Sequence, residues 1–225
     1  MVLLLVIAAF VALSMYNGYK EGMVKIVLSF LALAITLVIV VCATPVITKA
    51  VKKTDQFQKV VNKTEEKLEE KGVFKEGSAT DMINKLDVPQ QIKDTLLESN
   101  TVEKYEELSV KNANEYIVNM LASIILTGTV FAILLLVVFV LVRVAISVLD
   151  LLSKLPLIKQ MNKTGGLILG AAEGILLVWV FFVVVNIFGN TAFATMIYDQ
   201  VNQNEIVTFI YNNNLVMKIL LKLIA

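Results

Sequence analysis

Two residues of opposite charge, Arg143 and Glu173, lie inside or beside long apolar stretches of the sequence. Arg143 is the only arginine among the 20 basic residues. A planar guanidinium donates two hydrogen bonds to a carboxylate, which makes burial of both charges tolerable. We therefore expect an ion pair between Arg143 and Glu173, near the cytoplasmic face of a membrane. The alternative is that Arg143 extends to lipid phosphate groups at the membrane surface, because long cationic side chains can reach that far.

Glycines recur at four-residue intervals in the sequence GGLILGAAEG, as Gly166, Gly170 and Gly174. Gly18 and Gly22 have the same spacing near the start of the chain. On a helix this spacing places the glycines along one face, where two backbones can approach closely enough for dispersion and Cα–H contacts. The pattern predicts helix packing within the chain. A subunit interface and the wall of a pore are the alternative interpretations.

The sequence gives little support to an enzyme. It contains no His, which removes the commonest general base, the commonest zinc ligand and the Ser-His-Asp arrangement. The single Cys, Cys42, lies in an apolar stretch, where a thiol packs as a small hydrophobic side chain. Zinc-protease and phosphate-loop motifs are absent from the sequence. We therefore expect a protein that is not an enzyme and that needs no metal ion and no cofactor.

Four stretches without a charged residue determine the expected fold, and they are residues 1–19, 26–48, 116–142 and 174–198. A helix needs about 20 apolar residues to cross a bilayer. The composition, 57% hydrophobic and 17% charged, is more apolar than that of soluble domains, at roughly 45–50% and 25%. We predict an all-α polytopic membrane protein with about four transmembrane helices, a helical extramembrane insertion and a C-terminal amphipathic helix. The lipid bilayer is its main expected partner, and a net charge of +1 argues against nucleic acid.

The predicted organisation has four parts. Residues 1–48 form a first transmembrane hairpin, and residues 49–115 form a charged helical extramembrane segment. Residues 116–190 form a second transmembrane pair with a basic connector at 150–163, and residues 191–225 form an interfacial amphipathic tail. The short connectors are net positive, which places them in the cytoplasm and the charged segment outside.

The charged segment, residues 49–115, contains 12 lysines and 14 acidic residues. Its apolar spacing predicts short amphipathic helices, the first of them capped by Thr54 and ending at Gly72. Ser78 and Asp81 resemble a capping box that opens another helix. We interpret the segment as a small helical cap on the membrane. The alternative is a docking surface for a protein partner.

The order of these features resembles the colicin V production protein (CvpA) family over roughly residues 3–48 and 116–188. The matching pieces are the turn Gly18-Tyr19-Lys20-Glu21-Gly22, Pro45, Arg143, the basic linker 155–163 and the glycine pattern from Gly166 to Gly174. Two features depart from the family pattern. Residues 1–19 hold no acidic residue, and Glu173 stands where relatives more often have a basic residue.

The resemblance implies a multi-pass protein of the bacterial cytoplasmic (inner) membrane. Such a protein would act as an accessory or scaffold that supports production or export of a peptide toxin (a bacteriocin), or maintenance of the envelope. Two other classes stay open. One is a channel or transporter subunit that forms a homo-oligomer through its Gly-xxx-Gly helix, and the other is a membrane anchor that recruits a soluble protein through residues 49–115.

Overall fold

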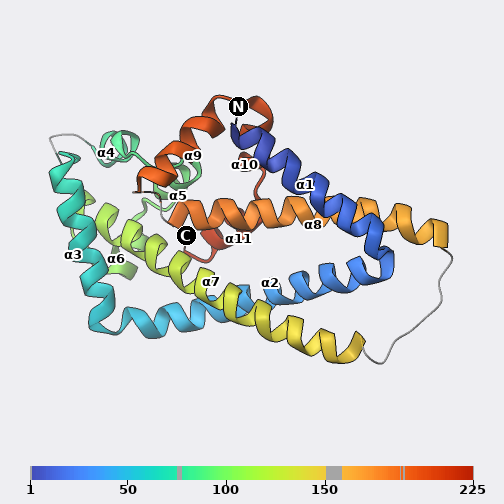
Figure 1. Cartoon of the computed structure of the whole chain (residues 1–225). Coiled ribbons are helices and arrows are strands. Elements are labelled where there is room, and N and C mark those ends of the chain that lie inside the picture. The colour runs from blue at the N-terminus through green and yellow to red at the C-terminus, as the bar shows by residue number, and fades with distance from the viewer. Residues whose placement is uncertain (1, 75–77, 151–158, 188, 190, 225) are drawn as a thin grey trace.

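Four long apolar helices form the main body of the protein. The computed structural model describes residues 2–74, 78–150, 159–187, 189 and 191–224. The long helices are α1 (Val2–Glu21), α2 (Met23–Lys52), α7 (Ala113–Asp150) and α8 (Lys159–Ile187) (Figure 1). Each is long and apolar enough to cross a membrane. The predicted all-α polytopic fold with four membrane-spanning helices is therefore confirmed.

The turn between α1 and α2 lies next to the start of α8. A single residue, Gly22, joins α1 to α2, and its φ of 86° lies in the left-handed region that glycine adopts without strain. At this end, the Lys163 ammonium of α8 lies 5.2 Å from the centre of the Tyr19 ring of α1. Most of the predicted basic connector, residues 150–163, lies outside the described residues.

The four spanning helices pack against one another in a bundle. Helix α1 contacts α8, and α2 contacts both α7 and α8. Val40 in the middle of α2 is fully buried. The helix continues through Pro45 to Lys52, beyond the predicted end of the span near residue 48. It continues because its last turns are still covered by the rest of the protein, since Thr48 is buried and Val51 is half-buried.

The 38-residue helix α7 is longer than a bilayer requires, at about 57 Å from its rise per residue. Its first half is enclosed by protein, with Tyr116 and Phe131 almost fully buried. Its second half, by contrast, exposes apolar side chains from Ile133 to Val144. Helices α1, α2 and α8 expose similar apolar residues, as expected for surfaces that contact lipid.

The charged segment folds into four short helices, which we call the cap: α3 (Asp55–Glu70), α4 (Ala79–Lys85), α5 (Gln90–Glu98) and α6 (Val102–Leu108). The predicted start signals are correct. Thr54 is the N-cap of α3, and the Ser78 side chain and the Asp81 backbone form the expected capping box at 3.2 Å. The Tyr116 hydroxyl of α7 donates to the Leu96 carbonyl of α5 at 2.7 Å, which fixes the cap to the bundle.

The C-terminal segment, which we call the tail, differs in detail from the single helix expected. It forms α9 (Ala192–Asn202), α10 (Glu205–Asn212) and α11 (Leu215–Lys222). The division arises because Asn204 and Asn214 each cap a new helix through the side-chain oxygen. The tail helices are amphipathic, but their buried residues, among them Val207 and Met217, pack against the rest of the protein. In Figure 1 helix α9 of the tail is drawn next to α5 of the cap.

Candidate functional site

A polar contact inside the bundle joins three of the spanning helices. The Ser29 hydroxyl of α2 accepts a hydrogen bond from Nη2 of Arg143 on α7 at 3.0 Å. The same hydroxyl donates to Oε1 of Glu173 on α8 at 2.6 Å. The two charges that the sequence predicted to pair are thus joined through a serine. Sequence reasoning did not select Ser29, although a hydroxyl in the charge-free stretch 26–48 was an available signal.

The surroundings of this contact favour a structural role. Arg143 is exposed, whereas Ser29 and Glu173 are half-buried. The Arg143 guanidinium lies 5.4 Å from the centre of the Phe139 ring one turn earlier in α7, within the range of a cation–π attraction. Hydrogen bonds to charged groups are stronger than those between neutral groups. The contact therefore fixes the rotation of α2, α7 and α8 relative to one another.

The glycines of the two sequence patterns meet in one interface. A Cβ atom added to Gly18 of α1 would collide with the carbonyl oxygen of Gly166 on α8, and it would lie 3.2 Å from the Gly170 Cα atom. A Cβ atom on Gly166 would lie 3.0 Å from the carbonyl carbon of Gly22. Backbone faces backbone here, so a side chain has no space without a shift of the helix.

The same interface continues further along α8. A Cβ atom on Gly170 would collide with the carbonyl oxygen of Ser14 and lie 3.2 Å from the Met15 Cα atom. One turn later, a Cβ atom on Gly174 would lie 3.3 Å from the Val11 Cα atom. All three glycines of the pattern in α8 thus face α1 of the same chain. This agrees with packing within the chain, and it leaves that face covered rather than open to a second copy or a pore.

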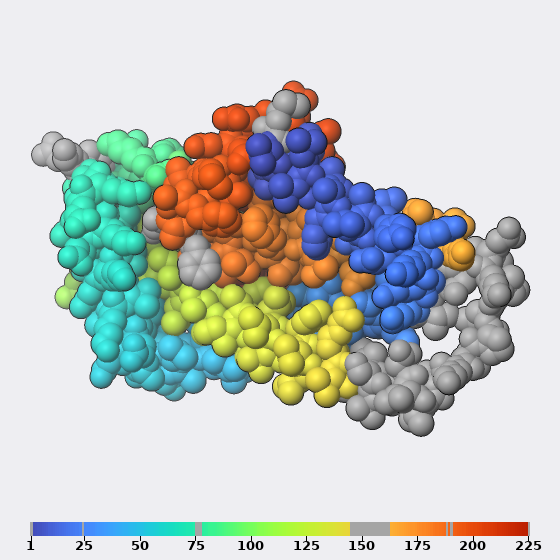
Figure 2. All heavy atoms as spheres, in the orientation of Figure 1, coloured from blue at the N-terminus to red at the C-terminus, as the bar shows by residue number. Residues whose placement is uncertain are grey.

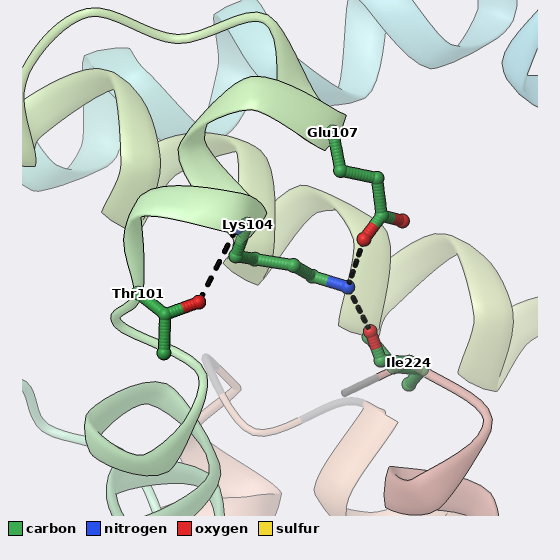
Figure 3. Close-up of polar contacts among 4 residues, drawn as sticks. All are labelled: Thr101, Lys104, Glu107 and Ile224. Atoms are coloured by element: carbon green, nitrogen blue, oxygen red, sulfur yellow. Dashed lines mark hydrogen bonds and ion pairs between the residues drawn. The ribbon is translucent and has the colours of Figure 1, made fainter.

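A buried lysine holds the end of the tail to the cap (Figure 3). The Lys104 ammonium of α6 donates to the Ile224 carbonyl oxygen at 3.0 Å and pairs with Oε2 of Glu107 at the same distance. Only 8% of Lys104 is exposed. A cation next to the carbonyl groups that follow a helix is stabilised by the helix dipole. Nothing in the sequence indicates this contact, because Lys104 is one of many lysines in a charged segment.

A second polar cluster joins the tail to the end of α8. The hydroxyl groups of Tyr211 and Tyr198 both donate to Oδ1 of Asn186, at 2.7 Å and 3.1 Å. Burial raises the pKa of Tyr211 and is the main cause that raises the pKa of Tyr198. Both phenols therefore stay protonated as donors at neutral pH. Gln91 of α5 reaches the same region and donates to the Tyr211 carbonyl at 3.1 Å.

A four-helix spanning bundle with a packed extramembrane layer defines a multi-pass α-helical membrane protein. The family model described as Colicin V production protein matches residues 105–214, a range that contains α7, α8, α9 and α10. Over this region the chain matches the colicin V production protein family, which confirms the resemblance drawn from its sequence. The earlier part of that resemblance, residues 3–48, lies outside the matched range. No curated protein and no solved structure matches the chain.

Proposed function

We propose that this protein is an accessory or scaffold protein of the bacterial cytoplasmic membrane. In this role it supports production or export of a peptide toxin and maintenance of the envelope. The observation that carries the proposal is the family match over residues 105–214. This range contains two of the spanning helices and most of the tail, which packs against the cap.

The packing supports a scaffold more than a loose anchor. One hydrophobic cluster includes Val40 and Phe131 of the spanning helices, Ile83 of the cap and Met217 of the tail. Because the core is continuous, the spanning helices hold the cap and tail in a fixed position. A fixed extramembrane surface suits a protein that positions other components at the membrane, and such a surface also suits the recruitment of a soluble partner by the cap.

The test uses a toxin-producing host that lacks this protein. We expect secreted toxin activity to fall while toxin accumulates inside the cells, and we expect the wild-type chain to restore secretion. Gly170→Leu should not restore it, because the substitution separates α1 from α8. Ala172→Leu is the matched control, since Ala172 is exposed on the same helix. Unchanged secretion in the host without the protein would contradict the proposal.

A channel requires a different arrangement of the bundle. In the channel interpretation the glycine face of α8 lines or closes a pathway, whereas α1 covers that face in the structure. Current measurements on the purified protein in planar bilayers separate the two functions. A scaffold predicts no conductance above that of protein-free bilayers. A conductance that Gly170→Leu alters and Ala172→Leu does not would favour the channel.

A further inference from the structure

A cavity of about 760 Å³ lies between the cap, the bundle and the tail. Its volume is within the range of small-molecule sites, roughly 300–1,000 Å³. The inner wall is apolar and includes Leu121 and Ile124 of α7, Val183 of α8 and Leu220 of α11. Figure 2 shows α3 at one edge of the molecule, with α7 and the tail helices next to it on this face.

A row of lysines borders the cavity on the α3 side. Lys59, Lys63, Lys67 and Lys71 recur at four-residue intervals, and all four line the cavity. Lys59, Lys63 and Lys67 share one side of α3 because residues four apart are neighbours on a helix, and Lys71 follows directly as the C-cap residue of α3. Lys85 adds a fifth cation from the end of α4. The acidic residues of α3 do not line the cavity. The side of the helix that faces the cavity is therefore basic.

The cavity border is therefore strongly basic. Among the described residues that line it, five are lysines and one, Asp87, is acidic. Asp87 pairs with Lys71 at 3.4 Å. The remaining positive charge favours an anionic group at the cavity mouth, because a phosphate attracts several ammonium groups at once.

A buried amide provides a second, independent sign of a ligand. Nδ2 of Asn186 is buried and has no hydrogen-bond partner, and Asn186 lines the cavity with only 8% of the residue exposed. The other side-chain atom, Oδ1, already accepts from two tyrosines. A buried donor without an acceptor is costly, so an acceptor oxygen in the cavity would satisfy it.

The cavity also lies at the expected depth for a lipid. On α7 its lining extends to Gly128 and Thr129, and the exposed apolar surface of that helix begins at Ile133. The apolar wall thus borders the membrane, while the lysines belong to the water-exposed cap. An acyl chain requires an apolar environment such as this wall, and a charged head group requires a water-exposed, basic environment such as the lysines of the cap.

We propose that this cavity binds an anionic phospholipid. The phosphate lies at the lysine row of α3, and an acyl chain lies on the apolar wall. An oxygen of the lipid accepts the free N–H of Asn186. This inference does not depend on the proposed function, since it concerns which lipid the extramembrane face holds.

The experiment is native mass spectrometry of the full chain in detergent. The protein is titrated with phosphatidylglycerol and, separately, with phosphatidylcholine of the same acyl chains. We expect tighter binding of phosphatidylglycerol. The double variant Lys63→Gln/Lys67→Gln should lose roughly 20-fold in affinity for it, because a lysine near an anionic lipid surface contributes about fivefold. Its affinity for phosphatidylcholine should change little.

Two further variants make the outcome decisive. Lys49→Gln/Lys53→Gln removes the same charge from exposed lysines that do not line the cavity, and it should bind phosphatidylglycerol like the wild type. Ile125→Trp fills part of the cavity and should weaken binding of phosphatidylglycerol, while circular dichroism verifies that it folds. Equal losses in the two lysine variants, or equal binding of the two lipids by the wild type, would overturn the proposal.

Discussion

Gly18 of α1 and Gly166 of α8 meet backbone to backbone, with no space for a side chain on either residue. This contact brings together the first and the last of the four spanning helices. Lipid offers no hydrophobic force that would drive helices together, so close packing of small residues is a main source of their association. The family-matched region, residues 105–214, is in this way fixed to a helix that lies outside it.

The close contact predicts that a larger side chain in the glycine interface destabilises the protein. Gly170→Leu introduces a side chain where a Cβ atom alone would collide with the backbone of α1. Overpacking of this kind costs about 1–3 kcal/mol. We expect the apparent Tm of the purified protein in detergent to fall by roughly 2–12 °C. Ala172→Leu should change the Tm little, and equal effects of the two substitutions would contradict the interface.

Removal of the Ser29 hydroxyl should lower the stability of the protein by more than the small change in side-chain size would. Ser29→Ala removes the hydroxyl that joins Arg143 to Glu173. We expect destabilisation of about 0.5–1.5 kcal/mol, the net contribution of a typical hydrogen bond, because Ser29 and Glu173 are half-buried and Arg143 is exposed. Ser29→Thr, which keeps a hydroxyl, should retain more stability. Thermal melting in detergent measures both variants, and a Ser29→Ala protein as stable as the wild type would refute the role of the bridge.

A charge exchange tests whether the two ionic groups act together. Arg143→Glu and Glu173→Arg should each destabilise the protein, because each places like charges around Ser29. The double exchange should recover part of the loss, since opposite charges again flank the serine. A double variant no better than the worse single variant would show that Arg143 and Glu173 act independently.

The contact of Lys104 with the Ile224 carbonyl predicts that one ammonium group contributes to holding the end of the tail. Lys104→Met keeps the apolar stem but removes the donor to the Ile224 carbonyl. Hydrogen bonds to charged groups contribute about 1.5–3 kcal/mol, so amide hydrogen exchange in α11 should become roughly 10-fold faster or more. Lys111→Met, at an exposed position between cap and bundle, should leave this exchange unchanged. Equal exchange in the two variants would contradict this role of Lys104.

The fold was largely predictable because apolar length, capping residues and turn glycines act locally. The four spans, the N-cap Thr54 and the Ser78–Asp81 capping box all depend on neighbours in the sequence. The tail was harder. Its apolar pattern suits either a membrane surface or a protein surface, and only tertiary packing distinguishes them.

The contacts of the candidate site were less predictable because they join distant segments. The sequence identified Arg143 and Glu173 but gave no reason to place Ser29 between them. It identified both sets of glycines without indicating that they face each other. The lysine row of α3 looked like an ordinary solvated face, since nothing in its spacing reveals the cavity beside it.

The central claim, that cap and tail share one side of a four-span membrane protein, is tested most directly by cysteine labelling. Single cysteines at Lys63, Glu205, Lys20 and Lys163 are introduced into a Cys42→Ala background and treated with a membrane-impermeant maleimide on intact cells. All four positions are exposed in the structure. We predict that positions 63 and 205 react on intact cells and that positions 20 and 163 react only after permeabilisation. Reaction of 63 and 205 from opposite sides, or of all four positions from one side, would contradict the account.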